Sequence, residues 1–338
     1  MTERSPAAIP RRVTIKDVAR AAGVDPSTVT RALQGSERVR QKTREKIVAI
    51  AKDMDYVPNQ AARTLVTQRS HLIGLVIPDL TNPFFADLSR GIDTEAKQHG
   101  LNVLIRNTDG NRQVEQAAIR LFVEMKVDGI IAPASRCSRK FYQSVSSSVP
   151  IVHVNRDDTE HHVCCDREAG TRAMVEHLIA LGHRRIAFVK GPGPAAAAKY
   201  EGYRSVMAAN FLPHGDELLL RFSGQLEHAV VLARRVLRLE PRPTAVFAWN
   251  DLCALGMMHA LGQAGVRVPE DISIAGHDDV AVAAISNPAL TTVHWPMFEL
   301  GRASVTYLQR LGSGETPSRV SVPAPTLTVR DSTGQVEQ

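Results

Sequence analysis

Beyond residue 70, the chain alternates between short apolar runs and longer segments whose apolar residues recur at helical spacing. This alternation predicts parallel β-sheets with right-handed helical crossovers. Because it restarts after Asp166, we expect an α/β body of two doubly wound lobes. The predicted strands are Leu72 to Pro78, Asn102 to Thr108, Gly129 to Ala134, Pro150 to Asn155, Arg185 to Gly191, 218 to 222, Ala245 to Asn250 and Ile272 to Gly276. The predicted helices are Pro83 to Gln98, Arg112 to Lys126, 167 to 181, 196 to 210, 226 to 239 and 251 to 264.

Charge is divided unevenly along the chain. Residues 1 to 70 hold 14 Lys and Arg against 7 Asp and Glu, whereas the other 268 residues hold 27 against 28. The formal net charge of +6 therefore comes from the first fifth of the molecule. This distribution favours a small N-terminal module that meets a polyanion, joined to a neutral body with a different task.

Several classes of protein are disfavoured by the same sequence. No apolar run approaches the roughly 18 residues of a membrane-spanning helix. Residues 1 to 12 lack the apolar core of a secretory signal, so we expect a flexible tail and a cytoplasmic protein. The spacing of the four cysteines provides neither a disulfide framework nor a C-x-x-C metal motif.

Residues 13 to 57 have the pattern of three short helices. Thr14 followed by Asp17 is a capping pair, and Gly23 permits the left-handed conformation that ends a helix. Pro26 opens a second helix at the position where a missing N–H costs nothing. Two helices joined by a short turn containing glycine predict a helix-turn-helix, with an ordinary basic three-helix subdomain as the alternative.

The third helix is expected over about Gln41 to Asp53. Its buried face should comprise Ile47, Val48 and either Ile50 or Ala51. Residues that precede or open this helix suit phosphate contacts, which position the module without sequence selectivity. These candidates are Arg38, Arg40, Lys42 and Thr43.

The second helix of such a motif presents its N-terminal side chains to the major groove of DNA. Arg31 offers two donors to a guanine edge, and Pro26 offers an apolar face to a thymine methyl. The other candidate DNA contacts of the module are Thr14, Ser27, Thr28 and Thr30.

The stretch from VTIKDVA, which begins at Val13, to YVPNQAARTL, which ends at Leu65, resembles without a gap the start of the LacI/GalR family of transcriptional regulators. The resemblance implies that residues 58 to 70 are a hinge that becomes helical on DNA. In that hinge Leu65 would wedge between base steps of the minor groove, a role that suits an apolar side chain. Further DNA contacts implied there are Asn59, Ala62 and Arg63. The alternative is that Leu65 packs the linker against the body.

The body resembles the same family and, through it, periplasmic sugar-binding proteins. The supporting segments are IGLVIPDLTNPFFADLSRGI, VDGIIA, GHRRIAFVKGP, FAWND, VPEDISIAGHDD and PALTTVHWP. The resemblance implies an effector-binding and dimerisation domain over residues 71 to 330 whose chain crosses between lobes three times. The first lobe would hold about 71 to 166 and 297 to 322, and the second about 167 to 296 and 323 to 330, leaving 331 to 338 as a tail.

Parallel sheets bind ligands at the carboxyl ends of their strands, so we expect an effector between the lobes. Aromatic rings stack on sugar or base faces, and a carboxylate accepts hydrogen bonds from hydroxyls. Carried over by position, the effector contacts implied are Phe84, Phe85, Asn155, Lys199, Asn250, Asp251, Asp278 and Trp295. Trp249 stands where the family usually has a small residue, and we add it because it falls beside the expected cleft.

The same positions suggest the chemistry of the effector. Lys199 stands where the family usually has arginine, so it offers a point charge and not a fork. We expect a sugar or sugar acid stacked on Trp295 with its carboxylate near Lys199. The alternatives are that Phe84 and Phe85 belong to the core and that Asp251 only caps the helix that it begins.

The sequence therefore predicts a ligand-responsive transcriptional repressor that binds a pseudopalindromic operator as a homodimer. A solute-binding protein is the alternative, although it would leave the basic module unexplained. An enzyme is not favoured, because residues 191 to 194 (GPGP) lack both a third glycine and the N–H groups of a phosphate cradle. His161 and His162 lie near Cys164 without a metal-ligand spacing, so we expect neither a metal nor a cofactor.

Overall fold

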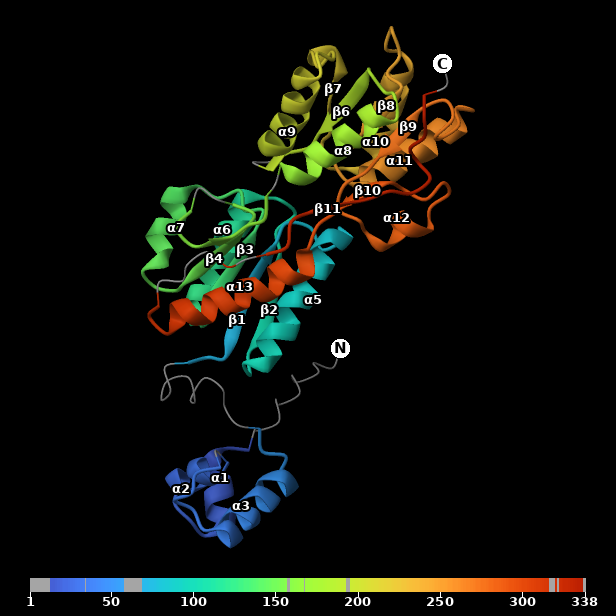
Figure 1. Cartoon of the computed structure of the whole chain (residues 1–338). Coiled ribbons are helices and arrows are strands. Elements are labelled where there is room, and N and C mark those ends of the chain that lie inside the picture. Colours follow the sequence, from blue (N-terminus) through green and yellow to red (C-terminus); the bar gives the residue numbers. More distant parts are fainter. Residues whose placement is uncertain are drawn as a thin grey trace, which may run out of the picture. The chain divides into compact units, whose positions relative to one another are not determined.

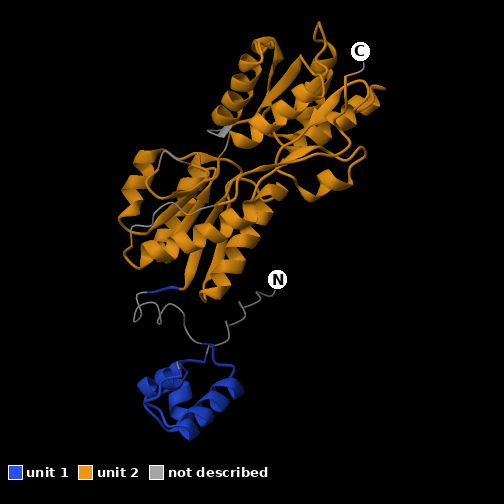
Figure 2. Ribbon diagram, viewed as in Figure 1, with its two compact units in different colours: residues 1–70 blue, residues 71–338 orange. Residues whose placement is uncertain are grey.

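The computed structural model describes residues 13–33, 35–57, 69–156, 159–166, 168–192, 195–315, 320 and 322–336. The chain divides into two units, residues 1–70 and residues 71–338 (Figure 2). The tail expected over residues 1–12 and residues 58–68 of the expected hinge lie outside the described residues.

The described residues of the first unit form three helices, at the places that the sequence predicts. They are α1 (Ile15–Ala22), α2 (Pro26–Leu33) and α3 (Gln41–Asp53). Ile47 and Ala51, one turn apart on α3, face the shared core. The predicted burial of Val48 is wrong, because its side chain is 45% exposed. The core of this unit comprises Val18, Ala19, Ala22, Val29, Ala32, Val39, Ile47 and Ala51.

The second unit begins with a lobe built on a parallel sheet of strand order β2-β1-β3-β4-β5 (Figure 1). Its strands are β1 (Leu72–Ile77), β2 (Asn102–Asn107), β3 (Gly129–Pro133), β4 (Ile151–Val154) and β5 (His162–Val163). Its helices are α5 (Pro83–Gln98), α6 (Arg112–Glu124), α7 (Arg139–Ser146) and α13 (Met297–Gly312). The central strand β1, LIGLVI, is apolar throughout because helices cover both faces of a parallel sheet.

Helix α13 returns to this first lobe and lies against α5 (Figure 1). Two glycines allow the helices to approach so closely. A Cβ atom on Gly91 would lie 2.1 Å from the carbonyl oxygen of Phe298, and one on Gly301 would lie 2.3 Å from that of Leu88. Nε of Arg302 also donates to Oε2 of the buried Glu95 at 2.9 Å, which ties the two helices together.

The second lobe repeats the design with a parallel sheet of order β7-β6-β8-β9. Its strands are β6 (Ile186–Lys190), β7 (Leu219–Arg221), β8 (Ala245–Phe247) and β9 (Ser273–Ala275). Its helices are α8 (Ala169–Ala180), α9 (Ala195–Ala209), α10 (Leu226–Leu237), α11 (Asp251–Gln263) and α12 (Ala281–Ile285), with a 3-10 turn at Asp216–Leu218. Between the lobes, β10 (Thr292–His294) pairs antiparallel with β11 (Thr326–Thr328). The doubly wound architecture expected from the alternation is present in both lobes.

Residues 331–336 differ from the tail that the sequence suggests. Ser332 is fully buried, and its hydroxyl donates to the carbonyl of Ile274 at 2.6 Å. The backbone N–H of Gly334 donates to Ser273 Oγ, and that of Val336 donates to the carbonyl of Leu181. These polar residues carry no apolar periodicity, so the sequence gives no sign that long-range hydrogen bonds hold them on the second lobe.

Candidate functional site

The first unit has the local geometry of a helix-turn-helix. The carboxylate of Asp17 accepts hydrogen bonds from the backbone N–H of Thr14 at 3.0 Å and from its hydroxyl at 2.6 Å, which fixes the start of α1. Gly23, with φ of +71°, ends that helix and turns the chain. Asp25 then accepts from the N–H of Ser27 at 2.8 Å and so begins α2.

Helix α2 presents one polar face outward. Ser27 and Arg31, four residues apart, are exposed on it, while Pro26, Thr28 and Thr30 are half-buried. The hydroxyl of Thr30 donates to the carbonyl of Pro26 at 3.1 Å, so one of its hydrogen bonds is already made within the helix.

The predicted phosphate contacts lie around the start of α3. Arg38, Arg40 and Lys42 are exposed there, and Thr43 is half-buried. Two neighbouring cations serve the fold instead: Arg44 donates to the carbonyl of Ser36 at 2.8 Å, and Lys46 donates to that of Ala22 at 3.2 Å. The remaining candidates, Asn59, Ala62, Arg63 and Leu65, lie outside the described residues.

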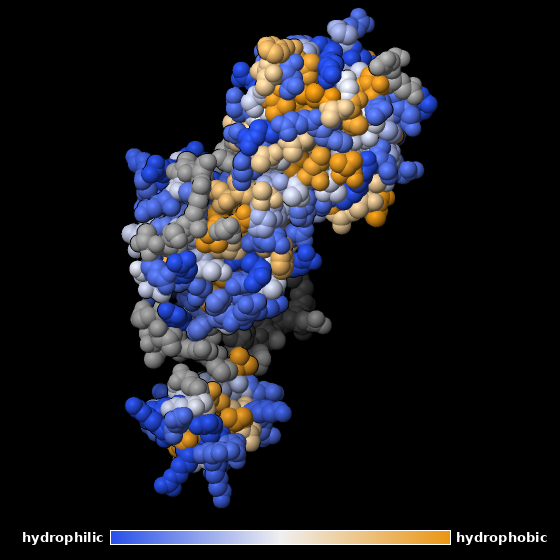
Figure 3. All heavy atoms as spheres, viewed as in Figure 1, coloured by the Kyte–Doolittle hydropathy of each residue, from blue (hydrophilic) through white to orange (hydrophobic). Residues whose placement is uncertain are grey.

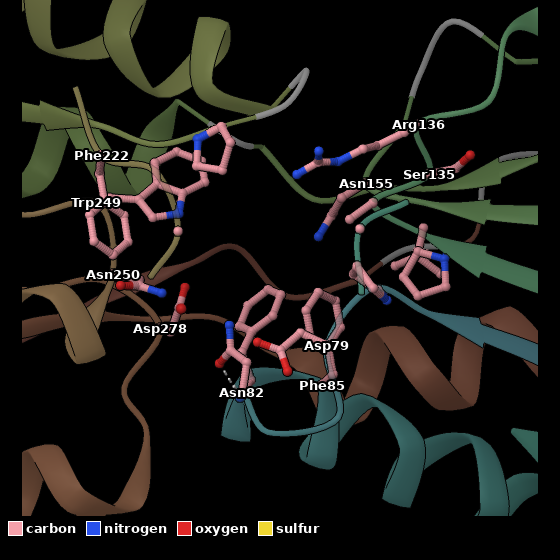
Figure 4. A pocket seen from close by; sticks show the side chains of 18 of the residues that line it. Asp79, Asn82, Phe85, Ser135, Arg136, Asn155, Phe222, Trp249, Asn250 and Asp278 are labelled. Atoms are coloured by element: carbon pink, nitrogen blue, oxygen red, sulfur yellow. Dashed lines mark hydrogen bonds between the residues drawn. The ribbon is translucent and has the colours of Figure 1, made fainter. Parts of the chain in front are cut away.

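In the second unit, a cavity of about 750 Å³ lies between the two lobes. The carboxyl ends of parallel strands from both sheets face each other across it (Figure 4). In the first lobe, Asp79 follows β1, Arg136 follows β3 and Asn155 follows β4. In the second, Phe222 follows β7, Trp249 and Asn250 follow β8, and Asp278 follows β9. We call this cavity the interlobe cleft.

A family model described as bacterial regulatory proteins, lacI family, matches residues 14–59, and a model of a periplasmic binding protein-like domain matches residues 175–333. The HTH-type transcriptional repressor PurR of Vibrio cholerae serotype O1 (strain M66-2) is 32% identical over 326 residues, which cover 94% of this chain and 97% of that protein. The chain belongs to the LacI family of bacterial regulatory proteins.

Solved structures of family members share the architecture. The lac repressor dimer bound to operator and the anti-inducer ONPF matches with a TM-score of 0.85 at 29% identity, covering 96% of this chain and 100% of that one. A complex of the transcriptional regulator CelR with cellobiose matches with a TM-score of 0.71 at 29% identity, covering 95% and 100%. The relatives are transcriptional regulators and not enzymes, and this LacI-family chain likewise joins a DNA-binding helix-turn-helix to a periplasmic-binding-protein-like body.

Among the predicted effector contacts, Lys199 has a side chain that is turned into the second lobe. It is 8% exposed, and its Nζ donates to the carbonyl of Trp249 at 3.2 Å and lies 3.0 Å from His277 Nδ1. The ammonium also lies 4.1 Å from the ring centroid of Trp249. Burial lowers the pKa of Lys199 to about 8, an effect that the carboxylates of Asp278 and Asp251 oppose.

The His277 imidazole joins this group to Asp278 and Trp295. Nε2 of His277 accepts a hydrogen bond from the indole N–H of Trp295 at 2.9 Å, and Nδ1 lies 3.1 Å from Oδ1 of Asp278. Burial holds the pKa of His277 well below its usual value and raises that of Asp278 well above its own. In the neutral imidazole one nitrogen accepts and the other donates, so Nδ1 carries the proton and faces the Asp278 carboxylate.

Asp251 is not brought to the interlobe cleft. It is 1% exposed, and its carboxylate accepts from the hydroxyl of Thr292 at 2.5 Å and from the N–H of Val280 at 2.8 Å. Burial raises the pKa of Asp251 to about 6. Asp251 therefore links α11 to β10 and to the start of α12 through hydrogen bonds. This position corrects the prediction that Asp251 contacts the effector.

The aromatic side chains predicted to contact the effector differ in how much of each is exposed to the cleft. Trp249 is half-buried and lines the cleft, whereas Trp295 lines it with a side chain only 5% exposed. Phe84 and Phe85 also line the cleft, and both pack against the core of the first lobe. Asn250 lines the cleft while its side-chain oxygen caps α11 by accepting from the N–H of Cys253 at 2.9 Å. Stacking on Trp295, as the sequence suggests, is thus limited to the edge that remains uncovered.

Several cleft residues were not predicted. Asp79, Asn82, Ser135, Arg136, Phe222 and Gln225 all line the cavity. Each lies at or soon after the carboxyl end of a predicted strand, so the rule that ligands bind at carboxyl ends of parallel strands would have found Asp79, Arg136 and Phe222. Within the described residues, no group of His, Cys, Asp and Glu is arranged to hold a metal ion. In the same part of the chain, no helix is both long and apolar enough to span a membrane.

Proposed function

We propose that this protein is a transcriptional repressor that binds a pseudopalindromic operator as a homodimer and responds to a sugar or sugar acid in the interlobe cleft. The observation that carries the proposal is the union, in one chain, of a helix-turn-helix with an exposed α2 face and a two-lobed body with a large cleft. Support comes from relatives: PurR is named a repressor, and the lac repressor structure is a dimer on its operator.

In this proposal α2 enters the major groove. Arg31 and Ser27 contact base edges, with Pro26, Thr28 and Thr30 beside them, and Thr14, Arg38, Arg40, Lys42 and Thr43 contact phosphates. Asn59, Ala62, Arg63 and Leu65 contact the minor groove from the hinge. One recognition helix covers only a few base pairs, so a symmetric pair of modules is needed for a specific site. Because its target is chromosomal DNA, the protein would act in the cytoplasm.

A symmetric dimer requires a surface on the body at which the two copies contact each other. Val282 and Ile285 of α12 are large apolar side chains that are 39% and 82% exposed. Figure 3 shows apolar atoms gathered over this part of the second lobe. Neighbouring exposed apolar side chains are typical of protein contact surfaces. We propose that a second copy of the chain covers this one, because a two-fold symmetric operator is bound by a symmetric dimer.

The effector would act by changing how the two lobes sit relative to each other. CelR is bound to cellobiose in its complex, which supports a sugar-like ligand here. A ligand that contacts both walls of the cleft favours one arrangement of the lobes, and coupling of about 1 to 3 kcal/mol would change operator affinity roughly 5- to 150-fold.

The proposal is tested by selecting binding sites from a library of random duplex DNA. We expect the selected sequences to share two inverted half-sites separated by a fixed spacing. A protein that enriches no sequence, or a single half-site, is not the proposed dimeric repressor. A chain that enriches nothing but binds a sugar in calorimetry would instead be a solute-binding protein. Sugars that bind are then added to the operator complex, whose affinity should change.

A further inference from the structure

Among the described residues, three cationic side chains line the interlobe cleft, and two of them are engaged within the protein. Lys199 donates to the carbonyl of Trp249 and lies beside His277, as described above. Arg156 donates to the carbonyl of Cys137 at 2.7 Å and lies over the ring of Tyr142. The third, Arg136, is exposed, and its guanidinium makes no hydrogen bond or ion pair with the part of the chain that the structure describes. Figure 4 shows this guanidinium directed into the cleft.

The loop that carries Arg136 is held rigidly. The buried carboxylate of Glu115 accepts from the backbone N–H of Arg136 at 3.0 Å, from the hydroxyl of Tyr142 at 2.6 Å and from the hydroxyl of Ser135. On the other side, a Cβ atom placed on Gly110 would lie 3.2 Å from Cζ of Arg136, so the guanidinium rests against that glycine. The side chain is thus directed by its surroundings, although its guanidinium forms no ion pair within the described chain.

Nearby acidic side chains of the first lobe accept hydrogen bonds from neutral groups and form no ion pair with Arg136. Asp79 accepts from the N–H and the hydroxyl of Thr81 at 2.8 and 2.6 Å. Asp109 accepts from the side-chain amide of Asn107 at 2.6 Å. A positively charged fork in a partly apolar cavity, which forms no ion pair with the described part of the chain, suits an anionic group of the ligand.

We propose that the effector is a polyhydroxylated carboxylic acid whose carboxylate pairs with Arg136, not with Lys199. This inference rests on the proposed function, since it names the ligand of the same cleft. One guanidinium balances the charge of one carboxylate, and its two parallel N–H donors match the two carboxylate oxygens. A phosphate dianion carries a second charge and calls for more than one free cation. The remaining hydroxyls would meet the side-chain amides of Asn82 and Asn250 and the face of Trp249.

The position of Arg136 also gives the carboxylate a role in closing the cleft. Arg136 belongs to the first lobe, and Trp249 and Asn250 belong to the second. A ligand that pairs with Arg136 at one end and contacts Trp249 at the other spans the two lobes. The carboxylate would therefore bind the first lobe while the rest of the same effector binds the second.

The test uses acids and their neutral counterparts on the full-length protein. D-gluconate is paired with D-sorbitol, D-galacturonate with D-galactose and D-glucuronate with D-glucose, with D-glucose 6-phosphate as a phosphate arm. Calorimetry and tryptophan fluorescence measure each affinity. We expect at least one acid to bind about 10- to 100-fold more tightly than its neutral partner, the range of a charge-assisted hydrogen-bonded pair.

Variants assign that difference to one residue. Arg136→Gln should reduce the affinity for the acid about 10- to 100-fold, to that of its neutral partner, and leave the neutral sugar unaffected. Arg136→Lys, which keeps the charge but not the fork, should lie between. Arg120→Gln, the same change at an exposed arginine of α6 outside the cleft, is the matched control and should leave both affinities alone.

Other outcomes overturn the inference without touching the proposed DNA-binding repressor. A neutral sugar that binds as tightly as its acid, or an acid whose affinity is unchanged in Arg136→Gln, shows that the carboxylate does not pair with this residue. A sugar phosphate that binds when no acid does overturns the carboxylate, as does a panel in which nothing binds. The proposed repressor fails separately, when the DNA selection described above enriches no site.

Discussion

The indole nitrogen of Trp295 donates a hydrogen bond to Nε2 of His277, over a distance of 2.9 Å, in the wall of the interlobe cleft. This bond connects the end of β10 to the loop after β9, the point at which the chain leaves the second lobe for α13. It also selects the imidazole tautomer that presents Nδ1–H to Asp278. The arrangement at this crossing is therefore fixed before any ligand enters.

Trp295→Phe keeps an aromatic ring but removes the one donor that Nε2 of the buried His277 has within the described chain. We expect the free energy of unfolding to fall by about 2 kcal/mol, since an unsatisfied buried acceptor costs about 1 to 3 kcal/mol. Urea denaturation measures this loss. Trp249→Phe is the matched control, because the indole N–H of Trp249 makes no hydrogen bond to the described residues. Equal losses in the two variants would show that ring size, and not the hydrogen bond, matters.

Stability should also depend on pH through His183, a buried histidine of the second lobe. Its ring bonds to the hydroxyls of Thr244 and Ser273 and lies 3.1 Å from the carbonyl oxygen of Gly334. Burial lowers the pKa of His183 to about 4. The unfolded chain takes up the proton near pH 6.5, so between about pH 4 and 6.5 it binds more protons than the folded protein. The contribution of His183 is therefore fully present above that window and is lost as the pH falls through it.

Comparison of the protein with its His183→Gln variant isolates this effect. Urea unfolding at pH 7.5 and pH 4.5 should show a stability difference between the two proteins that shrinks by about 2 kcal/mol at the lower pH. His259→Gln, at an exposed position of α11, serves as the control and should show no such change. A His183→Gln variant that loses as much stability at pH 4.5 as at pH 7.5 would contradict the assignment.

Two exposed cations of the first unit should have separable effects on DNA binding. Arg31→Ala should weaken binding to the selected operator by about 1 to 3 kcal/mol and relax the preference at one base position of each half-site. Lys42→Ala should weaken all duplexes alike and reduce the slope of log affinity against log salt by about 1. Fluorescence anisotropy with operator and unrelated duplexes at several salt concentrations measures both. If Arg31→Ala weakened both duplexes equally, its contact with a base edge would be ruled out.

Sequence patterns predicted the elements well where periodicity and capping agree. Helices α1 and α2 begin at Ile15 and Pro26, where the side chains of Asp17 and Asp25 accept backbone N–H groups, and Gly23 ends α1. Helix α3 begins at Gln41 without a side-chain cap, so its apolar periodicity alone predicted it. The sequence predicted less well which individual side chains point into the core. Val48 and Ile47 are adjacent in sequence, and only packing against α1 and α2 decides which one is buried.

The cleft shows the same limit. Asp251 and Asp278 both follow strands of the second sheet, and sequence alone assigns both to the ligand. The structure turns Asp251 inward because Thr292, 41 residues away, and Val280 supply its donors. Arg136, which we propose pairs with the effector, was not among the predicted contacts because the family resemblance directed attention to Lys199, although Arg136 follows β3. Long-range partners of this kind have no counterpart in local spacing.

The dimer proposed for operator binding depends on the apolar end of α12. Ile285→Asp places a charge at a side chain that is 82% exposed in the single chain and that a partner would cover. We expect sedimentation velocity to show a dimer for the natural protein at micromolar concentration and a dissociation constant at least tenfold weaker for the variant, the effect of about 1.4 kcal/mol or more. Phe211→Asp is the control, since that side chain is 96% exposed in the turn after α9. A variant at Ile285 that remains dimeric would place the interface elsewhere on the body, and a natural protein that stays monomeric with and without operator would contradict the dimer itself.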